Sequence, residues 1–198
     1  MAIRSILIYG GAFNPPHKGH IALLNAAIEG VHPDRTLVIP TKISPHKQGG
    51  GVSFWQRFHM CRCFLSLPGV RRSILEWLLP GKSYTLNTVK RLKKRHPGAG
   101  IFLLIGTDML ATFTEWYHYK ELLAACTLVA GGREGDDDTE IAAAASALEA
   151  EGGRVVLLRH RPFEISSTEI RRAFAETGRC DAVTPEVEAY IIRNRLYG

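Results

Sequence analysis

Short apolar runs recur along the chain, and helical patterns lie between them. The run from Ile101 to Ile105 is continuous, which is typical of a strand buried on both faces of a parallel sheet. Similar runs predict strands over residues 6–9, 36–39, 73–79, 101–105, 127–130 and 155–158. Strands that alternate with helices in this way form parallel βαβ units. We therefore predict an α/β fold with a doubly wound parallel sheet and helices on both of its faces.

The helices are predicted from the spacing of apolar residues and from capping residues. Ser53 with Gln56 three residues later is typical of a capping box, and Thr184 followed by Pro185 is typical of a helix start. The expected helices run from about 16 to 30, from 53 towards 68, over 85–96, 109–125 and 139–151, and onward from 166 and 184. With 198 residues and 45% hydrophobic content, we expect one domain over 1–198, which includes the C-terminal segment 165–198.

The charge balance favours anionic partners without choosing among nucleotides, RNA and anionic lipid. The formal net charge is +6. A basic run at 90–95 is more often a solvated helix face, and no aromatic-interleaved RNA motif accompanies it, so we expect no nucleic-acid partner. No apolar stretch approaches the length of a transmembrane helix, so we also expect no membrane partner.

The cysteine pattern argues against a zinc ribbon and against a disulfide framework, because it contains no CxxC pair and no even spacing. The four cysteines are Cys61, Cys63, Cys126 and Cys180. We therefore expect a reduced, cytoplasmic protein.

A glycine-rich loop follows the first apolar run directly. Gly10 and Gly11 come after residues 6–9, and a helical pattern begins soon after Pro16. Glycine lets the backbone approach a ligand without a Cβ in the way. A strand, a glycine loop and a helix start in this order are typical of a phosphate site, because N–H groups at the helix start point towards the anion. We expect this loop to bind an anion.

Two histidines, His17 and His20, close the loop. If the helix begins near Pro16, both imidazoles share one face and can contact the same ligand. Histidines at this spacing are also common on polar surfaces, and their geometry permits zinc, although no third ligand stands at a recognisable spacing. The position after the first strand favours phosphate. The absence of GxxxxGK(S/T) and of GxGxxG argues against a P-loop enzyme and a dinucleotide dehydrogenase.

A second candidate anion site lies near the other end of the chain. Residues 165–171 read ISSTEIR and follow the last expected strand. Ser166 and Glu169 form a capping box, so an ordinary helix start is one interpretation. Hydroxyl groups, N–H groups and Arg171 at one helix start also suit phosphate, because arginine can bind it with two hydrogen bonds. Two such sites are what a triphosphate needs.

Both segments resemble motifs of a known enzyme superfamily. Residues 10–20, GGAFNPPHKGH, are similar to the GGxF(D/N)PxHxGH signature of the HxGH nucleotidyltransferases, which are adenylyl- and cytidylyltransferases on a Rossmann-like fold. Residues 165–171 are similar to the ISSTxIR motif of these enzymes. Further matches resemble the nicotinate mononucleotide adenylyltransferases: PHK at 45–47, SYTxxT at 83–88, the segment at 105–108 with Trp116, and the C-terminal VxxYI and LY.

The resemblance implies transfer of the adenylyl group of ATP to nicotinate mononucleotide in NAD biosynthesis, with Mg²⁺ accompanying ATP and no metal held by the protein alone. The implied catalytic residues are His17, His20 and Arg171. The implied ATP-binding residues are Gly10, Gly11, Ala12, Phe13, His17, His20, Gly106, Asp108, Ile165, Ser166, Ser167, Thr168 and Arg171. The implied mononucleotide-binding residues are Asn14, Lys47, Tyr84, Thr85, Trp116 and Arg133.

Two positions depart from the family pattern. Ala12 stands where Thr or Ser is frequent, and in the segment 131–135 only Arg133 matches the usual RPG. Nicotinamide mononucleotide and pantetheine phosphate stay open as alternative acceptors. From a different class, a nucleotide- or RNA-binding module without catalysis also stays open, as does a homo-oligomeric state.

Overall fold

The structure is a computed structural model, and it describes residues 3–42, 51–132, 138–159 and 165–198. At its centre lies a six-stranded sheet in the order β3-β2-β1-β4-β5-β6, with every neighbouring pair parallel. The strands are β1 (Ser5–Gly11), β2 (Arg35–Pro40), β3 (Val70–Arg72), β4 (Gly100–Ile105), β5 (Thr127–Gly132) and β6 (Val155–Arg159). This is the strand order of a Rossmann-like doubly wound sheet, so the predicted fold class is confirmed.

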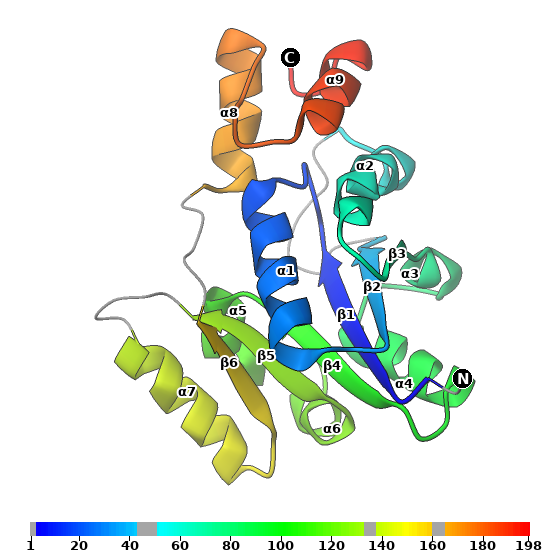
Figure 1. The fold of residues 1–198 in the computed structure, drawn as a ribbon, viewed down its shortest axis with the longest axis vertical. Helices are drawn as coiled ribbons and strands as arrows, with labels where there is room; N and C mark the ends of the chain where they lie inside the picture. The colour runs from blue at the N-terminus through cyan, green and yellow to red at the C-terminus, as the bar shows by residue number, and fades with distance from the viewer. Residues whose placement is uncertain (1–2, 43–50, 133–137, 160–164) are drawn as a thin grey trace.

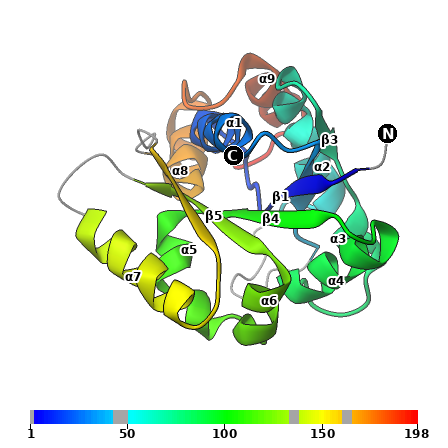
Figure 2. The same cartoon turned by 60° about the horizontal axis from the view of Figure 1, so that its bottom comes forward.

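Helices cover both faces of the sheet. Figures 1 and 2 show α1, α2, α8 and α9 on one side of it and α4, α5, α6 and α7 on the other. The α-helices are α1 (Lys18–Val31), α2 (Phe54–Met60), α3 (Leu75–Leu78), α4 (Thr85–Arg95), α5 (Thr107–Ala111), α6 (Tyr119–Ala125), α7 (Asp138–Ala150), α8 (Ser167–Thr177) and α9 (Pro185–Arg193). Two 3₁₀ helices, η1 (Cys61–Ser66) and η2 (Phe113–Glu115), follow α2 and α5. Among the described helices, none is long and apolar enough to cross a membrane.

The side chains of β1 alternate between two hydrophobic cores. Ile6 and Ile8 pack in one core with Leu86 of α4, while Leu7 packs in the other with Leu24 of α1. All five side chains are almost fully buried. Burial on both faces explains why the strands read as continuous apolar runs in the sequence.

The chain changes direction across the sheet at β1. This strand pairs with β2 on one side and with β4 on the other, so the connections on its two sides run in opposite directions. Its carboxyl end is Gly11, and β4 ends nearby at Ile105. In Figure 1, α8 and α9 lie beyond this end of the strands. Open α/β sheets bind ligands in the crevice at such a point.

The strand predicted over 73–79 is wrong. The structure places a three-residue strand at 70–72 and a short helix, α3, after it. Ser73 directs the chain out of the sheet, because its Oγ accepts a hydrogen bond from the N–H of Leu75 at 3.2 Å. Leu75 and Glu76 are both buried. A short apolar run fits a buried helical turn as well as a strand, so periodicity could not distinguish them.

The single helix predicted over 109–125 is also wrong. The structure divides this stretch into α5, η2 and α6. Trp116 adopts an extended conformation, and His118 adopts a left-handed one with φ at 52°. Neither conformation continues a helix. The break leaves Trp116 and Tyr117 in a connecting segment.

The predicted helix starts at Ser53 and Thr184 are confirmed. Ser53 and Gln56 exchange hydrogen bonds as a capping box, at 2.8 Å and 3.3 Å. The Thr184 hydroxyl oxygen accepts a hydrogen bond from the N–H of Val187 at 3.4 Å, and Pro185 occupies the first turn of α9. Short-range patterns of this kind are readable from sequence because donor and acceptor are three residues apart.

Candidate active site

The loop after β1 is shaped around the ring of Phe13. This residue has a left-handed backbone with φ at 46°, and its ring is buried 5.3 Å from the ring centres of Tyr9, His20 and Phe64. A Cβ at Gly11 would meet the Phe13 ring at 3.0 Å, so only glycine fits there without displacement. Aromatic packing therefore holds a backbone conformation that is unfavourable for phenylalanine.

Gly10 has a different environment from Gly11. A Cβ added at Gly10 would meet nothing closer than the backbone oxygen of Ile39, at 4.0 Å. Protein packing therefore does not require glycine at this position, and the open space agrees with the predicted close approach of a ligand. Both glycines belong to the end of β1 rather than to the loop.

The structure brings the two predicted histidines together at the start of α1. His17 is the N-cap residue, and its backbone N–H donates to Nδ1 of His20 at 3.2 Å. The two ring centres are 3.6 Å apart. Because Nδ1 of His20 accepts, the proton of a neutral His20 ring lies on Nε2. The predicted shared face is confirmed.

His17 is the more buried of the two histidines. Its side chain is 8% exposed, and its Nδ1 has no hydrogen-bond partner among the described residues. Burial lowers the pKa of His17 to about 4, so the imidazole is neutral near pH 7 in the free protein. A buried nitrogen without a partner is costly unless a ligand pairs with it.

The start of α8 confirms the predicted capping box. The N–H and hydroxyl of Ser166 donate to Glu169 Oε2 at 2.7 and 2.8 Å, and Ser166 Oγ accepts from the N–H of Glu169 at 3.2 Å. These hydrogen bonds lower the pKa of Glu169. The Ser166 hydroxyl is thus occupied in building the helix start. Ile165, just before it, packs against the core that holds α1.

Hydrogen bonds join the start of α8 to the loop after β1. The Ser167 hydroxyl donates to the backbone oxygen of Pro15 at 3.0 Å, and Arg171 donates to the backbone oxygen of Asn14 at 2.9 Å. Arg171 also donates to the Thr168 hydroxyl oxygen at 3.0 Å. The two predicted anion sites, from opposite ends of the chain, are therefore adjacent. Arg171 positions the loop through these contacts in addition to its predicted role with phosphate.

Tyr197 is a site residue that sequence reasoning missed. Its hydroxyl donates to the side-chain oxygen of Asn14 at 2.6 Å, which orients the amide of that predicted mononucleotide-binding residue. Burial raises the pKa of the Tyr197 hydroxyl, so it remains a donor. In the sequence, the LY ending indicates only a family resemblance. The contact between Tyr197 and Asn14 could not be predicted from it, because the two positions are 183 residues apart.

The turn after β4 faces the loop after β1. Gly106 is the N-cap residue of α5, and a Cβ there would lie 2.5 Å from Oδ1 of Asp108. The Asp108 side chain therefore folds back over Gly106. Gly106 directly follows Ile105, where β4 ends, and β4 pairs with β1 through Leu104 and Tyr9. Both predicted residues thus lie at the crevice of the sheet.

Aromatic stacking joins two predicted mononucleotide-binding segments. Tyr84, which precedes Thr85 at the start of α4, stacks on Tyr117 with ring centres 4.2 Å apart. The neighbouring Trp116 is half-buried and packs against Phe113 with ring centres 5.3 Å apart. Trp116 therefore packs against the hydrophobic core and leaves part of its ring exposed. Tyr117 was missed, and its only signal was its position beside Trp116.

Some predictions concern residues outside this arrangement. Lys47 and Arg133 lie outside the described residues. Within the described part of the chain, no three His, Cys, Asp or Glu side chains are grouped to hold a metal ion.

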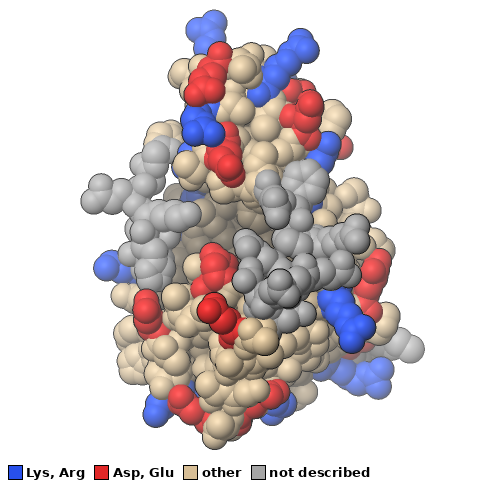
Figure 3. Space-filling view, turned by 90° about the vertical axis from the view of Figure 1, so that its left-hand side faces the viewer, with Lys and Arg blue, Asp and Glu red and all other residues tan. Residues whose placement is uncertain are grey.

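From the side of α7 and α8, the molecular surface is hollowed between the two helices (Figure 3).

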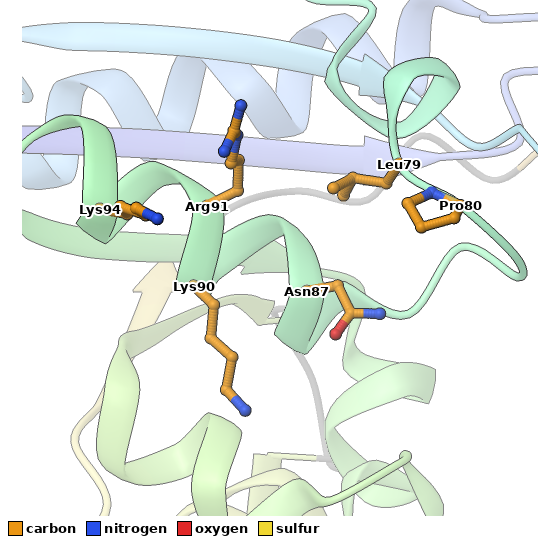
Figure 4. A pocket seen from close by; sticks show the side chains of 6 residues that line it. All are labelled: Leu79, Pro80, Asn87, Lys90, Arg91 and Lys94. Carbon is orange, nitrogen blue, oxygen red and sulfur yellow. The ribbon is translucent and has the colours of Figure 1, made fainter.

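A shallow hollow on α4 involves a different set of residues. Leu79, Pro80, Asn87, Lys90, Arg91 and Lys94 line it (Figure 4). None of the predicted nucleotide-binding residues contributes to it. Lys90 in this hollow forms an exposed ion pair with Glu121 at 2.7 Å. The basic run of α4 thus behaves as a solvated face.

The fold and the two joined helix starts define a nucleotide-binding α/β protein. A family model described as cytidylyltransferase-like matches residues 8–173. The chain belongs to this family and, within it, to the nicotinate-nucleotide adenylyltransferases, which are nucleotidyltransferases. It is 32% identical to the nicotinate-nucleotide adenylyltransferase of Bacillus subtilis over 199 residues, covering 98% of this chain and 99% of the relative.

Other relatives and solved structures agree with this assignment. A protein of Pelobacter propionicus described as a probable nicotinate-nucleotide adenylyltransferase is 36% identical, with 96% of each chain covered. The structure of Plasmodium falciparum nicotinic acid mononucleotide adenylyltransferase complexed with NaAD has a TM-score of 0.79 to this chain at 19% identity, covering 98% of this chain and 97% of the other. At that identity the likeness shows the fold alone.

Proposed function

We propose that this chain transfers the adenylyl group of ATP to the 5′-phosphate of nicotinate mononucleotide, giving nicotinate adenine dinucleotide and pyrophosphate for NAD biosynthesis in the cytoplasm. The observation that carries the proposal is the hydrogen-bonded junction of the loop after β1 with the start of α8. It is supported by relatives named for this activity at 32–36% identity over nearly the whole chain.

The acceptor needs no protein base. A phosphate monoester has a second pKa near 6, so it is largely dianionic at neutral pH and is already a nucleophile. It attacks the α-phosphorus of ATP, the bond from that phosphorus to the bridging oxygen breaks, and pyrophosphate leaves. The protein then acts by positioning two polyanions and by stabilising their charge. No covalent intermediate with the protein is expected.

The side chains at the start of α1 supply hydrogen-bond donors for this task. The buried Nδ1 atom of His17 lacks a hydrogen-bond partner among the described residues, and the ring of His20 lies 3.6 Å from the ring of His17. A bound triphosphate favours the protonated imidazole, so ATP binding raises the pKa of His17 from about 4. The catalytic role that the family resemblance implies for His17 therefore depends on the bound nucleotide.

Mg²⁺ fits this scheme as a companion of the triphosphate. The described residues bring no metal-binding group of three side chains together, so phosphate oxygens would provide most of its ligands. When bound, it would neutralise part of the triphosphate charge. The chain's own residues then orient the nucleotide through side chains at the starts of α1 and α8 and through the N–H groups there that are not already bonded within the protein.

The experiment that tests this function is pyrophosphate release from ATP with a panel of acceptors. We expect release with nicotinate mononucleotide and a kcat/KM about 10-fold or more lower with nicotinamide mononucleotide, because a site that pairs a carboxylate discriminates against the amide. Pantetheine phosphate should give none. A preference for nicotinamide mononucleotide or pantetheine phosphate would show that the proposed acceptor is wrong. No pyrophosphate release with any acceptor would favour a nucleotide- or RNA-binding module without catalysis.

A further inference from the structure

Arg57 of α2 connects the segments that follow β1 and β2. Its side chain is 8% exposed. Nη1 donates to the backbone oxygen of Ala12 at 2.6 Å, and Nη2 donates to the backbone oxygen of Thr41 at 2.6 Å. Hydrogen bonds from a charged donor are among the stronger ones in proteins, and the planar guanidinium fixes the geometry of both at once. One side chain thus sets the separation of two loops.

These contacts begin where the sheet stops holding the two segments together. β1 and β2 pair up to Gly11 and Pro40, and the N–H of Thr41 still donates to the oxygen of Gly11 at 2.9 Å. Beyond this point, the first segment continues to the histidines of α1 and the second continues to Lys42. The Arg57 guanidinium is the next cross-connection after the ladder ends.

Glu76 of α3 is a second buried charged side chain near Arg57. Its side chain is 5% exposed, the Thr88 hydroxyl lies 3.5 Å from Oε1, and Oε2 lacks a hydrogen-bond partner among the described residues. Burial raises the pKa of Glu76, while the Ser83 hydroxyl, the N–H of Lys42 and the Arg57 charge act in the opposite direction. Glu76 therefore faces both Arg57 and the segment before Tyr84.

Glu76 is a buried acidic side chain near Arg57, although the two form no direct ion pair among the described residues. Three acidic groups interact electrostatically with Arg57: Cys61, Tyr197 and Glu76. Burial raises the pKa of the Cys61 thiol and of the Tyr197 phenol, so both are neutral near pH 7. When it is ionised, the Glu76 carboxyl group can therefore compensate part of the Arg57 charge. Removing either partner of a buried pair leaves the other uncompensated.

The segment after β2, which Arg57 contacts at Thr41, is also hydrogen-bonded to the segment that is proposed to bind the mononucleotide. The N–H of Lys42 donates to the Ser83 hydroxyl oxygen at 3.0 Å, and Ser83 directly precedes Tyr84 and Thr85. Ala12 lies on the ATP side. We propose that Arg57 and Glu76 are positioning residues that fix the loop after β1 relative to the segment 83–85, and so align the acceptor phosphate with ATP. This inference rests on the proposed function.

The test compares Arg57→Lys with Arg72→Lys as a matched control. Arg72 also donates to a backbone oxygen at 2.6 Å, that of Phe58, and among the described residues it has no hydrogen bond to the loop after β1 or to the segment 83–85. Lysine cannot hold two carbonyl groups in the same fixed geometry. We expect Arg57→Lys to lower kcat about 10- to 100-fold, because small misplacements of reacting groups have effects of that size. Dissociation constants for ATP alone and mononucleotide alone should change less than about threefold.

In urea unfolding, Arg57→Lys should lose more stability than Arg72→Lys, because Arg57 makes two backbone hydrogen bonds and Arg72 makes one. Arg72→Lys should keep the wild-type kcat. Equal kcat values for the two variants would overturn the positioning role, as would a loss confined to the binding of one substrate. A wild type that releases no pyrophosphate would overturn the proposed function and the inference with it. An active wild type with an unaffected Arg57→Lys would overturn the inference alone.

A second variant covers the case in which Arg57→Lys does not fold. Glu76→Gln keeps the shape of the side chain and its contact with Thr88 but removes the charge. We expect kcat to fall about 3- to 10-fold with unchanged binding of each substrate. If Arg57→Lys folds, the double variant should lose little more than Arg57→Lys, because the two residues act together. Independent, multiplicative losses, or an unchanged kcat in Glu76→Gln, would contradict the coupling.

Discussion

His17 shows how one buried side chain can serve both the fold and a ligand. It caps α1 next to the ring of His20, and its buried Nδ1 lacks a hydrogen-bond partner among the described residues. A bound ligand can form a hydrogen bond with that nitrogen and so offset the free-energy cost of burying it. The same burial makes acid stability sensitive to this residue.

We predict that His17→Gln makes the protein less sensitive to acid. The pKa of His17 is about 4 when folded, compared with 6.5 ordinarily, so the unfolded chain takes up the proton first as the pH falls. The stabilisation present above pH 6.5 is lost as the pH falls towards 4, and the loss should reach about 2 kcal/mol by pH 5. Urea unfolding of both proteins at pH 7.5 and pH 5 measures it. The same pH dependence in both would contradict this account.

The residues that sequence reasoning missed make long-range contacts. Arg57 bonds to Ala12 across 45 positions, and Tyr197 bonds to Asn14 across 183. Neither position has a local pattern that indicates its partner. His17, His20 and Ser166 were predictable because each one belongs to a short motif in which the interacting groups lie three residues apart.

At the scale of elements, the starts of α1 and α8 carry the proposed function. Both begin with a capping arrangement, and α8 also holds the loop before α1 through Ser167 and Arg171. Loss of a helix cap should therefore have different consequences in different helices. A cap at the site affects both stability and ligand binding, while a cap elsewhere affects stability alone.

The helix caps Ser166 and Thr184 provide this comparison. We predict that Ser166→Ala and Thr184→Ala each lower the free energy of unfolding by about 1 kcal/mol, because each removes the acceptor for an N–H group in the first turn. Only Ser166→Ala should raise the KM for ATP, by about threefold or more, since α8 begins beside the loop. Steady-state kinetics at varied ATP measures it. A rise of the same size in Thr184→Ala would show that general destabilisation is the cause.

Most strands of the sheet were predictable from the sequence. The predictions failed where tertiary packing determines whether a segment forms a strand or a helix. Continuous apolar runs located β1, β2, β4, β5 and β6, because burial on both faces leaves a clear pattern. The stretch 73–79 has the same composition, yet Ser73 ends the strand and Leu75 and Glu76 are buried in a helical turn. The break at Trp116 and His118 depends on single backbone conformations, which periodicity does not encode.

At the scale of the whole molecule, the two ends of the chain combine into one site. The loop before α1 is held by Arg171 and Tyr197 from the last part of the chain. The N–H of Lys18, at the start of α1, also donates to the backbone oxygen of Ala182 at 2.8 Å. This arrangement explains why motifs so far apart in sequence could be predicted to share a triphosphate. The single-domain organisation and any oligomer stay predictions.

The joined starts of α1 and α8 are proposed to carry out adenylyl transfer. The most direct test is the rate of nicotinate adenine dinucleotide formation by His20→Ala, with His32→Asn at the other end of α1 as the control. We predict that kcat falls about 10²-fold in His20→Ala, roughly 3 kcal/mol, while the protein still folds with a loss of about 1 kcal/mol in the free energy of unfolding, because the acceptor for the N–H of His17 is removed. His32→Asn should keep the wild-type rate. A folded His20→Ala with near-normal kcat would contradict the account.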